Sequence, residues 1–113
     1  MKDCIFCKIA AGQVKANLVY EDAEVVAFRD LNPQAPVHIL IIPRKHIERV
    51  SEATESDFPV IMNIHKAAQK LVEQEPRLKE GFRMITNNGV AAGQTVNHLH
   101  YHVLGGRTLS HIF

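Results

Sequence analysis

Three histidines near the carboxyl end of the chain occupy alternate positions. His98, His100 and His102 are separated by Leu99 and Tyr101. Successive side chains of a β-strand point to opposite faces, so on a strand these imidazoles would share one face, about 6.6–6.8 Å apart. Near neutral pH an imidazole can act as a nucleophile, an acid, a base or a metal ligand. A solvated polar face is the alternative, and it explains a single histidine better than three in register.

The loop that precedes this row has a composition suited to anion binding. It contains Gly89 and the run Gly93, Gln94, Thr95. Glycines allow the backbone to approach a ligand closely, so N–H groups, the Gln94 amide and the Thr95 hydroxyl could hold a phosphate. Alone, an Asn-Gly loop is usually only a turn. Beside the histidine row, it predicts a phosphate cradle that faces a nucleophile.

The two cysteines, Cys4 and Cys7, have the spacing of half a tetrahedral zinc site. The chain has no second cysteine pair, so two further ligands would have to be histidines. A thioredoxin-like redox pair is disfavoured because no βαβ pattern precedes the motif. Two unpaired buried thiols are a further alternative.

The composition indicates one globular domain over residues 1–113. Apolar residues make up 46% of the chain and charged residues 22%, which excludes a disordered chain. Thirteen Lys and Arg against twelve Asp and Glu leave a net charge of +1, so we expect no nucleic-acid or membrane partner. Residues 1–8 lack the apolar stretch of a signal peptide, and the best apolar run, 37–43, is too short to span a membrane. We therefore expect a cytoplasmic protein.

Periodicity and breakers predict the elements that position these residues. Asp3 can cap a short helix over 4–10. An amphipathic helix is expected from Ser56 to about Glu75, with Pro59 in its first turn. The expected strands cover residues 18–20, 25–28, 37–42, 82–86 and 99–104. Helix, three strands, helix and two strands predict an α+β domain: a five-stranded antiparallel meander sheet with two helices packed on it.

With these segments in place, the sequence resembles the histidine-triad (HIT) family, and within it the Hint branch of nucleoside phosphoramidases. The alternating histidines lie between a Gly-Gln-Thr and a Gly-Gly-Arg sequence, as in that family. Further agreement, in order, covers residues 4–9, 27–30, 33–38, 41–47 and 81–84. The resemblance implies a homodimer with a continuous sheet, and hydrolysis of purine nucleoside 5′-phosphoramidates at the P–N bond of the α-phosphate.

The resemblance also implies a role for each histidine of the catalytic set. His100 would be the nucleophile that forms a nucleotidyl-histidine intermediate, with its other ring nitrogen donating to a backbone carbonyl. His102 would donate to the phosphate oxygens, and His38 would lie on the leaving-group side. A structural Zn²⁺ would be held by Cys4, Cys7, His46 and His98, and no catalytic cofactor is implied.

The remaining implied residues bind the nucleotide. Asp30 would accept from the ribose hydroxyls, although it could equally be a turn residue, as could Asn87. The base would lie against Ile5, Phe28 and Leu31, with Ile9 and Val14 as further contributors, although such apolar residues are usually core. The phosphate oxygens would be met by Asn87, Gly93, Gln94 and Thr95.

Two other functions are compatible with the same residues. One is a nucleotide-binding regulatory module in which hydrolysis is vestigial. The other is a metal-binding protein that uses the histidine row as ligands. Turnover of a phosphoramidate separates the first from an enzyme, and loss of all ligand binding on metal removal would identify the second.

Overall fold

The structure is a computed structural model that describes residues 3–111. Met1 and Lys2, which belong to the segment considered above for a signal peptide, lie outside the described residues. The helices are α1 (Ile5–Ala10) and α2 (Phe58–Gln74). The strands are β1 (Leu18–Glu21), β2 (Val25–Arg29), β3 (Val37–Pro43), β4 (Phe82–Ile85) and β5 (Tyr101–Gly105). The predicted order of elements and the α+β class are confirmed.

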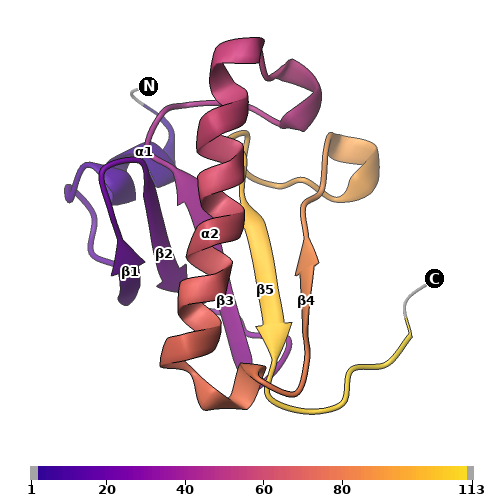
Figure 1. Ribbon diagram of the computed structural model, residues 1–113. Coiled ribbons are helices and arrows are strands. Elements are labelled where there is room, and N and C mark those ends of the chain that lie inside the picture. Colours follow the sequence, from indigo (N-terminus) through magenta and orange to yellow (C-terminus); the bar gives the residue numbers. More distant parts are fainter. Residues whose placement is uncertain (1–2, 112–113) are drawn as a thin grey trace.

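All five strands pair antiparallel in one sheet, whose order is β1-β2-β3-β5-β4. The first three strands form the expected meander, but the last two do not continue it. Along the chain, helix α2 follows β3 and precedes β4, and it lies across one face of the sheet (Figure 1). A helical crossover of this kind returns the chain parallel to the strand that it left. Strand β5 then fills the space between β3 and β4, antiparallel to both. The sheet is therefore a meander only as far as β3.

Strand β3 is buried along its whole length because both faces of the sheet are covered. On one face, Ile39 and Ile41 pack against α2 residues such as Ile64. On the other, Leu40 packs with Phe28 and with Phe6 of α1. His38 lies two residues before Leu40, so it points to this second face, where α1 rather than α2 covers the sheet.

Both helices begin one to two residues later than the sequence predicts. At α1 the cap is Cys4, whose sulfur accepts from the Cys7 N–H at 3.3 Å, and not Asp3. At α2, a short 3₁₀ turn precedes the helix, and Thr54 and Asp57 form a reciprocal capping box there. Pro59 lies in the first turn of α2, as expected, where it costs no hydrogen bond.

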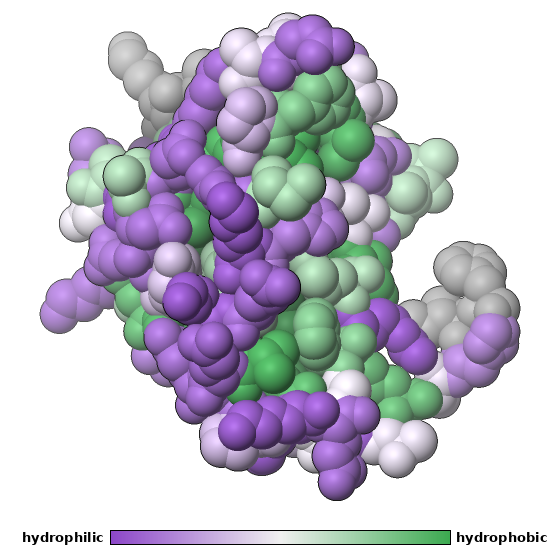
Figure 2. Space-filling model, in the orientation of Figure 1, coloured by the Kyte–Doolittle hydropathy of each residue, from purple (hydrophilic) through white to green (hydrophobic). Residues whose placement is uncertain are grey.

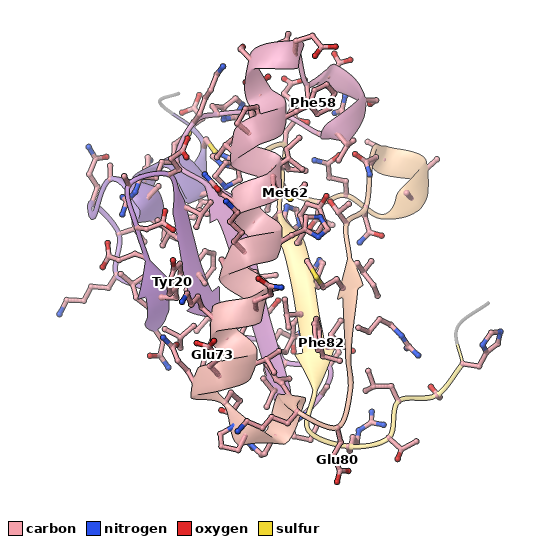
Figure 3. The ribbon with its side chains drawn as sticks, viewed as in Figure 1. Tyr20, Phe58, Met62, Glu73, Glu80 and Phe82 are labelled. Carbon is pink, nitrogen blue, oxygen red and sulfur yellow. The ribbon has the colours of Figure 1, made fainter. Side chains whose placement is uncertain are left out.

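On the side of the molecule where α2 covers the sheet, polar side chains follow the helix and apolar side chains lie beside it (Figure 2). Phe58 and Met62 of α2 and Phe82 of the edge strand β4 are 48%, 57% and 40% exposed, and all are visible on this side (Figure 3). Within residues 3–111, no helix has the length and apolar character needed to cross a membrane.

Candidate functional site

The histidine row only partly follows the predicted strand. Pairing of β5 with β3 begins at Tyr101, opposite Ile41, so His102 stands on the strand, whereas His98 and His100 precede it. The strand begins late because two backbone carbonyls beside its start accept hydrogen bonds from side chains. The Pro43 carbonyl is 2.8 Å from His98 Nε2, and the His100 carbonyl accepts from the Thr86 hydroxyl at 2.8 Å. These bonds replace ladder bonds that a longer strand would make.

The three rings nevertheless gather on the α1 face of the sheet. The ring of Phe6 lies edge-on to His98 and His100, at centroid distances of 5.9 and 5.1 Å. The rings of His100 and His102 are 5.2 Å apart. Phe6 was not singled out from the sequence, because an apolar residue between two cysteines carries no signal of its own.

His100 is buried, and its ring orientation is fixed by the chain just before it. Its Nδ1 lies 2.7 Å from the carbonyl oxygen of His98. A carbonyl can only accept, so Nδ1 carries the proton and the Nε2 lone pair of the neutral ring is free. This confirms the expected contact between one ring nitrogen and a backbone carbonyl. It leaves the other nitrogen in the form that a nucleophile requires.

His38 and His102 are joined in a directional chain of hydrogen bonds. The backbone N–H of Gln34 donates to His38 Nδ1 at 3.0 Å. The proton of a neutral His38 must therefore lie on Nε2, which is 2.9 Å from His102 Nδ1. By the same reasoning, His102 accepts at Nδ1 and carries its own proton on Nε2. The chain thus turns His102 Nε2 into a hydrogen-bond donor.

Both of these histidines are held in the neutral form. Burial, reinforced by the neighbouring rings of His100 and His38, lowers the pKa of His102 to about 4 against the opposing charge of Asp30. Burial also lowers the pKa of His38, again opposed by Asp30. Neutral imidazoles are what the hydrogen-bond directions above require.

The lowered pKa of His102 predicts acid sensitivity of the fold. The unfolded chain, with a histidine pKa near 6.5, takes up a proton before the folded one does. The contribution of His102 to stability is therefore present above its unfolded pKa of about 6.5, falls as the pH drops toward 4, and levels off below 4. Between pH 7 and 5 the loss is on the order of 2 kcal/mol for this group. Urea titrations should show that His102→Asn loses less stability over this interval than the parent protein; an equal loss in both contradicts the assignment.

Asp30, His38 and His102 present metal-type ligand atoms within 4.8 Å of one another, but their hydrogen bonds do not suit a metal. Asp30 Oδ2 lies 3.5 Å from His38 Nε2. Coordination at that nitrogen would need its lone pair, and would move the proton to Nδ1, against the N–H of Gln34. These three residues are instead suited to fixing which ring nitrogens of His38 and His102 carry a proton. Asp30 is itself held in place, because its Oδ1 accepts from the Asn32 N–H at 2.8 Å.

The second ligand cluster, Cys4, Cys7, His46 and His98, does fit a metal. His98 Nδ1 is 3.2 and 3.5 Å from the sulfurs of Cys4 and Cys7, and His46 Nδ1 is 3.3 Å from Cys7 Sγ. In a tetrahedral zinc site, sulfur and nitrogen ligands are about 3.6 Å apart, as the usual bond lengths require. The Nε2–H of His98 donates to the Pro43 carbonyl, leaving the Nδ1 lone pair directed at the cysteines.

His98 therefore serves two neighbouring groups with different atoms. Its ring belongs to the Cys/His cluster, while its backbone carbonyl orients His100. Burial is the main cause that lowers the pKa of His98 to about 4. Within the described residues, neither ligand cluster contains His100, so the histidine row is not a single ligand set.

The residues expected to cradle a phosphate divide into two kinds. The carboxamide of Gln94 bonds both within the loop and to the segment after His46. Its Nε2 donates to the Glu48 and Val96 carbonyls at 2.7 and 3.0 Å, and its Oε1 accepts from the Gly89 N–H at 2.7 Å and from Arg49 Nε at 3.1 Å. The Gln94 carboxamide thus shapes the loop in this structure, and its contact with a phosphate stays a prediction. Thr95 and Gly93 are exposed, and Asn87 is partly buried.

The residues expected to contact a base also divide. Phe28 and Ile9 are buried in the apolar cluster on the α1 face, and Val14 packs against it. Ile5 is 42% exposed and Leu31 98% exposed. Phe28 and Ile9 therefore contribute to the core, Val14 is partly buried, and Ile5 and Leu31 are the most exposed of the five. Contact of these residues with a base stays a prediction.

Comparison with known proteins places these residues in a wider context. A model of the HIT domain family matches residues 11–109. An uncharacterized HIT-like protein of Synechocystis is 44% identical over 109 residues, covering 96% of this chain and 95% of that protein.

Solved structures agree closely in fold. A HIT family hydrolase from Clostridium thermocellum is 49% identical, with a TM-score of 0.94 over 99% of this chain and 97% of that one. A histidine triad protein from Clostridium difficile is 42% identical, with a TM-score of 0.96 over 100% of this chain and 98% of that one.

Proposed function

This chain belongs to the HIT domain family, and from that premise we propose that it hydrolyses purine nucleoside 5′-phosphoramidates, with His100 as the nucleophile. The observation that carries the proposal is the bond from His100 Nδ1–H to the His98 carbonyl. It holds a neutral imidazole in the tautomer whose Nε2 can attack phosphorus.

The reaction has two balanced steps. In the first, His100 Nε2 forms a bond to the α-phosphorus, the P–N bond breaks, and the amine leaves with a proton taken up from solvent, while the ring, which keeps its Nδ1 proton, becomes an imidazolium. In the second, water attacks the same phosphorus, the bond to Nε2 breaks, and a nucleoside monophosphate and the neutral imidazole are released together with one proton, which returns to solvent. The donor at His102 Nε2, set by His38, is suited to the phosphoryl oxygens, where charge accumulates. Such a donor is worth about 3–4 kcal/mol in acyl-transfer enzymes.

Other parts of the proposal concern nucleotide binding. Asp30 accepts from the ribose hydroxyls, the exposed Ile5 and Leu31 contact the base, and Thr95, Gly93 and Asn87 surround the phosphate. Asp30 retains acceptor capacity for this role because each carboxylate oxygen has more than one lone pair.

The Cys/His cluster is proposed to hold a structural Zn²⁺. Four protein ligands leave no open position, so the ion would supply stability and no chemistry at phosphorus. It would tie α1, which follows Cys4, to the end of β3 and to the segment before β5.

We also propose a homodimer in which the sheet continues across the β4 edge. Strand β4 is an edge of the sheet, and the exposed Phe58, Met62 and Phe82 lie on the α2 face beside it. An exposed edge strand is a ready template for pairing with a second chain.

The activity is tested with adenosine 5′-phosphoramidate. We expect stoichiometric release of AMP and ammonia, and a sample quenched with alkaline detergent, in which a P–N bond to histidine survives, should contain protein that carries one adenylyl group on the peptide with His100. AMP binding without any turnover would contradict the proposal and favour the regulatory module.

A further inference from the structure

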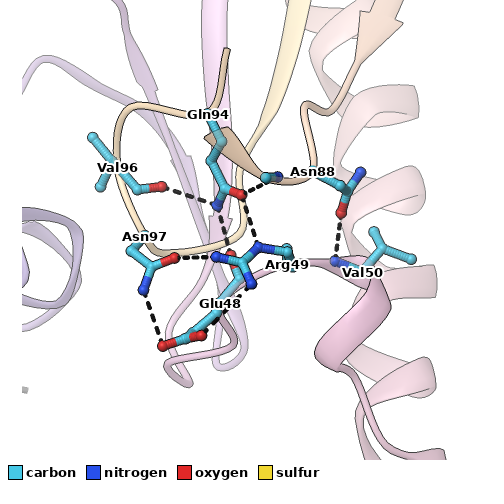
Figure 4. Close-up of polar contacts among 8 residues, drawn as sticks. Glu48, Arg49, Val50, Asn88, Gln94, Val96 and Asn97 are labelled. Atoms are coloured by element: carbon cyan, nitrogen blue, oxygen red, sulfur yellow. Dashed lines mark hydrogen bonds and ion pairs between the residues drawn. The ribbon is translucent and has the colours of Figure 1, made fainter. Parts of the chain in front are cut away.

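Two segments far apart in the sequence are fastened together by four polar side chains, Glu48, Arg49, Gln94 and Asn97, which we term the clasp (Figure 4). Arg49 donates from Nε to Gln94 Oε1 at 3.1 Å and from Nη2 to Asn97 Oδ1 at 2.7 Å. The carboxylate of Glu48 accepts from Asn97 Nδ2 at 2.9 Å. The clasp joins the chain after His46 to the loop that precedes the histidine row.

Arg49 acts on the residue around which this loop is folded. Gln94 is only 9% exposed, and its Oε1 accepts from both Arg49 and the Gly89 N–H. Gly89 and Gly93 both have a φ near +90°, so the loop depends on backbone conformations that only glycine adopts readily. A loop of this kind needs side-chain contacts to keep one conformation.

We propose that Arg49 is a positioning residue for the phosphate-binding loop, acting through Gln94 and Asn97 without touching the nucleotide. The inference rests on the proposed function in that it takes the segment around Thr95 to bind the phosphate. Arg49 bonds to Gln94 and to Asn97, which are the first and last residues of the run 94–97. Its planar guanidinium provides two donors in a fixed arrangement, which a lysine cannot reproduce.

The position of Arg49 indicates that it orders the loop more than it stabilises the fold. Its side chain is 26% exposed and belongs to neither apolar cluster. Removing it should leave the sheet and α2 intact while lowering the fraction of molecules whose loop is ordered. Apparent nucleotide affinity falls in proportion to that fraction.

The test compares Arg49→Ala and Arg49→Lys with a matched control, Arg77→Ala. Arg77 also donates from Nε and Nη2, at 3.0 and 3.2 Å, but to Glu75 beyond the end of α2. We expect Arg49→Ala to weaken AMP binding and raise KM about tenfold, with kcat changed less than about threefold. Arg49→Lys should recover part of the affinity, and Arg77→Ala should bind AMP like the parent.

Amide hydrogen exchange over residues 88–97 reports on the same contacts without nucleotide, and should be faster in Arg49→Ala and unchanged in the control Arg77→Ala. Asn97→Ala, which removes one of the two bonds of Arg49, should shift exchange and affinity in the same direction by less, and serves if Arg49→Ala fails to fold. Unchanged loop exchange, or AMP affinity within about twofold of the parent in both variants, overturns the inference. Absence of phosphoramidate turnover by the parent counts against the proposed function alone.

Discussion

Replacing His100 with alanine should lower the rate of amine release from adenosine 5′-phosphoramidate by at least about 10⁴-fold. The variant loses the only atom proposed to form a bond to phosphorus. Among the described residues, no other histidine has its Nδ1 proton held by a backbone carbonyl as His100 has. The ring of His100 is enclosed by Phe6, His98 and His102. The assay is steady-state release of amine and AMP at pH 7.

AMP affinity is the control for this variant, because the other proposed nucleotide contacts remain. We expect the dissociation constant for AMP to stay within about fivefold of the parent value. The variant should also show no adenylylated peptide after quenching with alkaline detergent, whereas the parent should show it. Turnover by His100→Ala within about tenfold of the parent would exclude nucleophilic attack by this histidine.

Removing metal from the Cys/His cluster should cause the largest change in stability. We expect the purified protein to contain about one equivalent of zinc. Free zinc at a thousand times its dissociation constant stabilises the folded state by about 4 kcal/mol. For a domain of this size, such a loss lowers Tm by more than about 10 °C, which calorimetry with and without chelator measures.

The matched control is the double variant Cys4→Ser/Cys7→Ser, whose Tm should equal that of the stripped protein and should not respond to added zinc. Both forms should keep phosphoramidate turnover at temperatures where they are folded, since no metal ligand is proposed to react. Metal below about a tenth of an equivalent, with an unchanged Tm for Cys4→Ser, would show that the cluster is a pair of free thiols beside two histidines.

Much of the fold could be predicted from the sequence because its signals are local. Pro59 and the apolar spacing after it located α2, and the β-branched runs located all five strands within a few residues. The position of β5 between β3 and β4 was not predictable from those patterns, because it follows from the direction in which the α2 crossover returns the chain. The start of β5 was missed because side chains of His98 and Thr86 occupy the backbone groups that a longer ladder would use.

In the site, too, the types of the functional residues could be predicted, whereas the groups that they contact could not. The cysteine pair identified itself by type and spacing, whereas the choice of His46 and His98 among seven histidines came from the family resemblance. Gln34 could not, since it acts through a backbone N–H that every residue except proline possesses. Gln94 was identified by type, but its partners within the fold, such as the Gly89 N–H and the Glu48 carbonyl, could not be named in advance, because a carboxamide can bond to many kinds of polar group.

The double use of His98 makes the two centres chemically independent although they share a residue. What His100 takes from position 98 is a main-chain oxygen, which any amino acid would provide, whereas the thiol pair takes the imidazole. If the proposed roles hold, a chain with this fold could lose its cysteines and replace His98 with a residue that coordinates nothing, and still present an oriented His100 ring. The proposed metal site would then add stability to the proposed catalytic site without taking part in its chemistry.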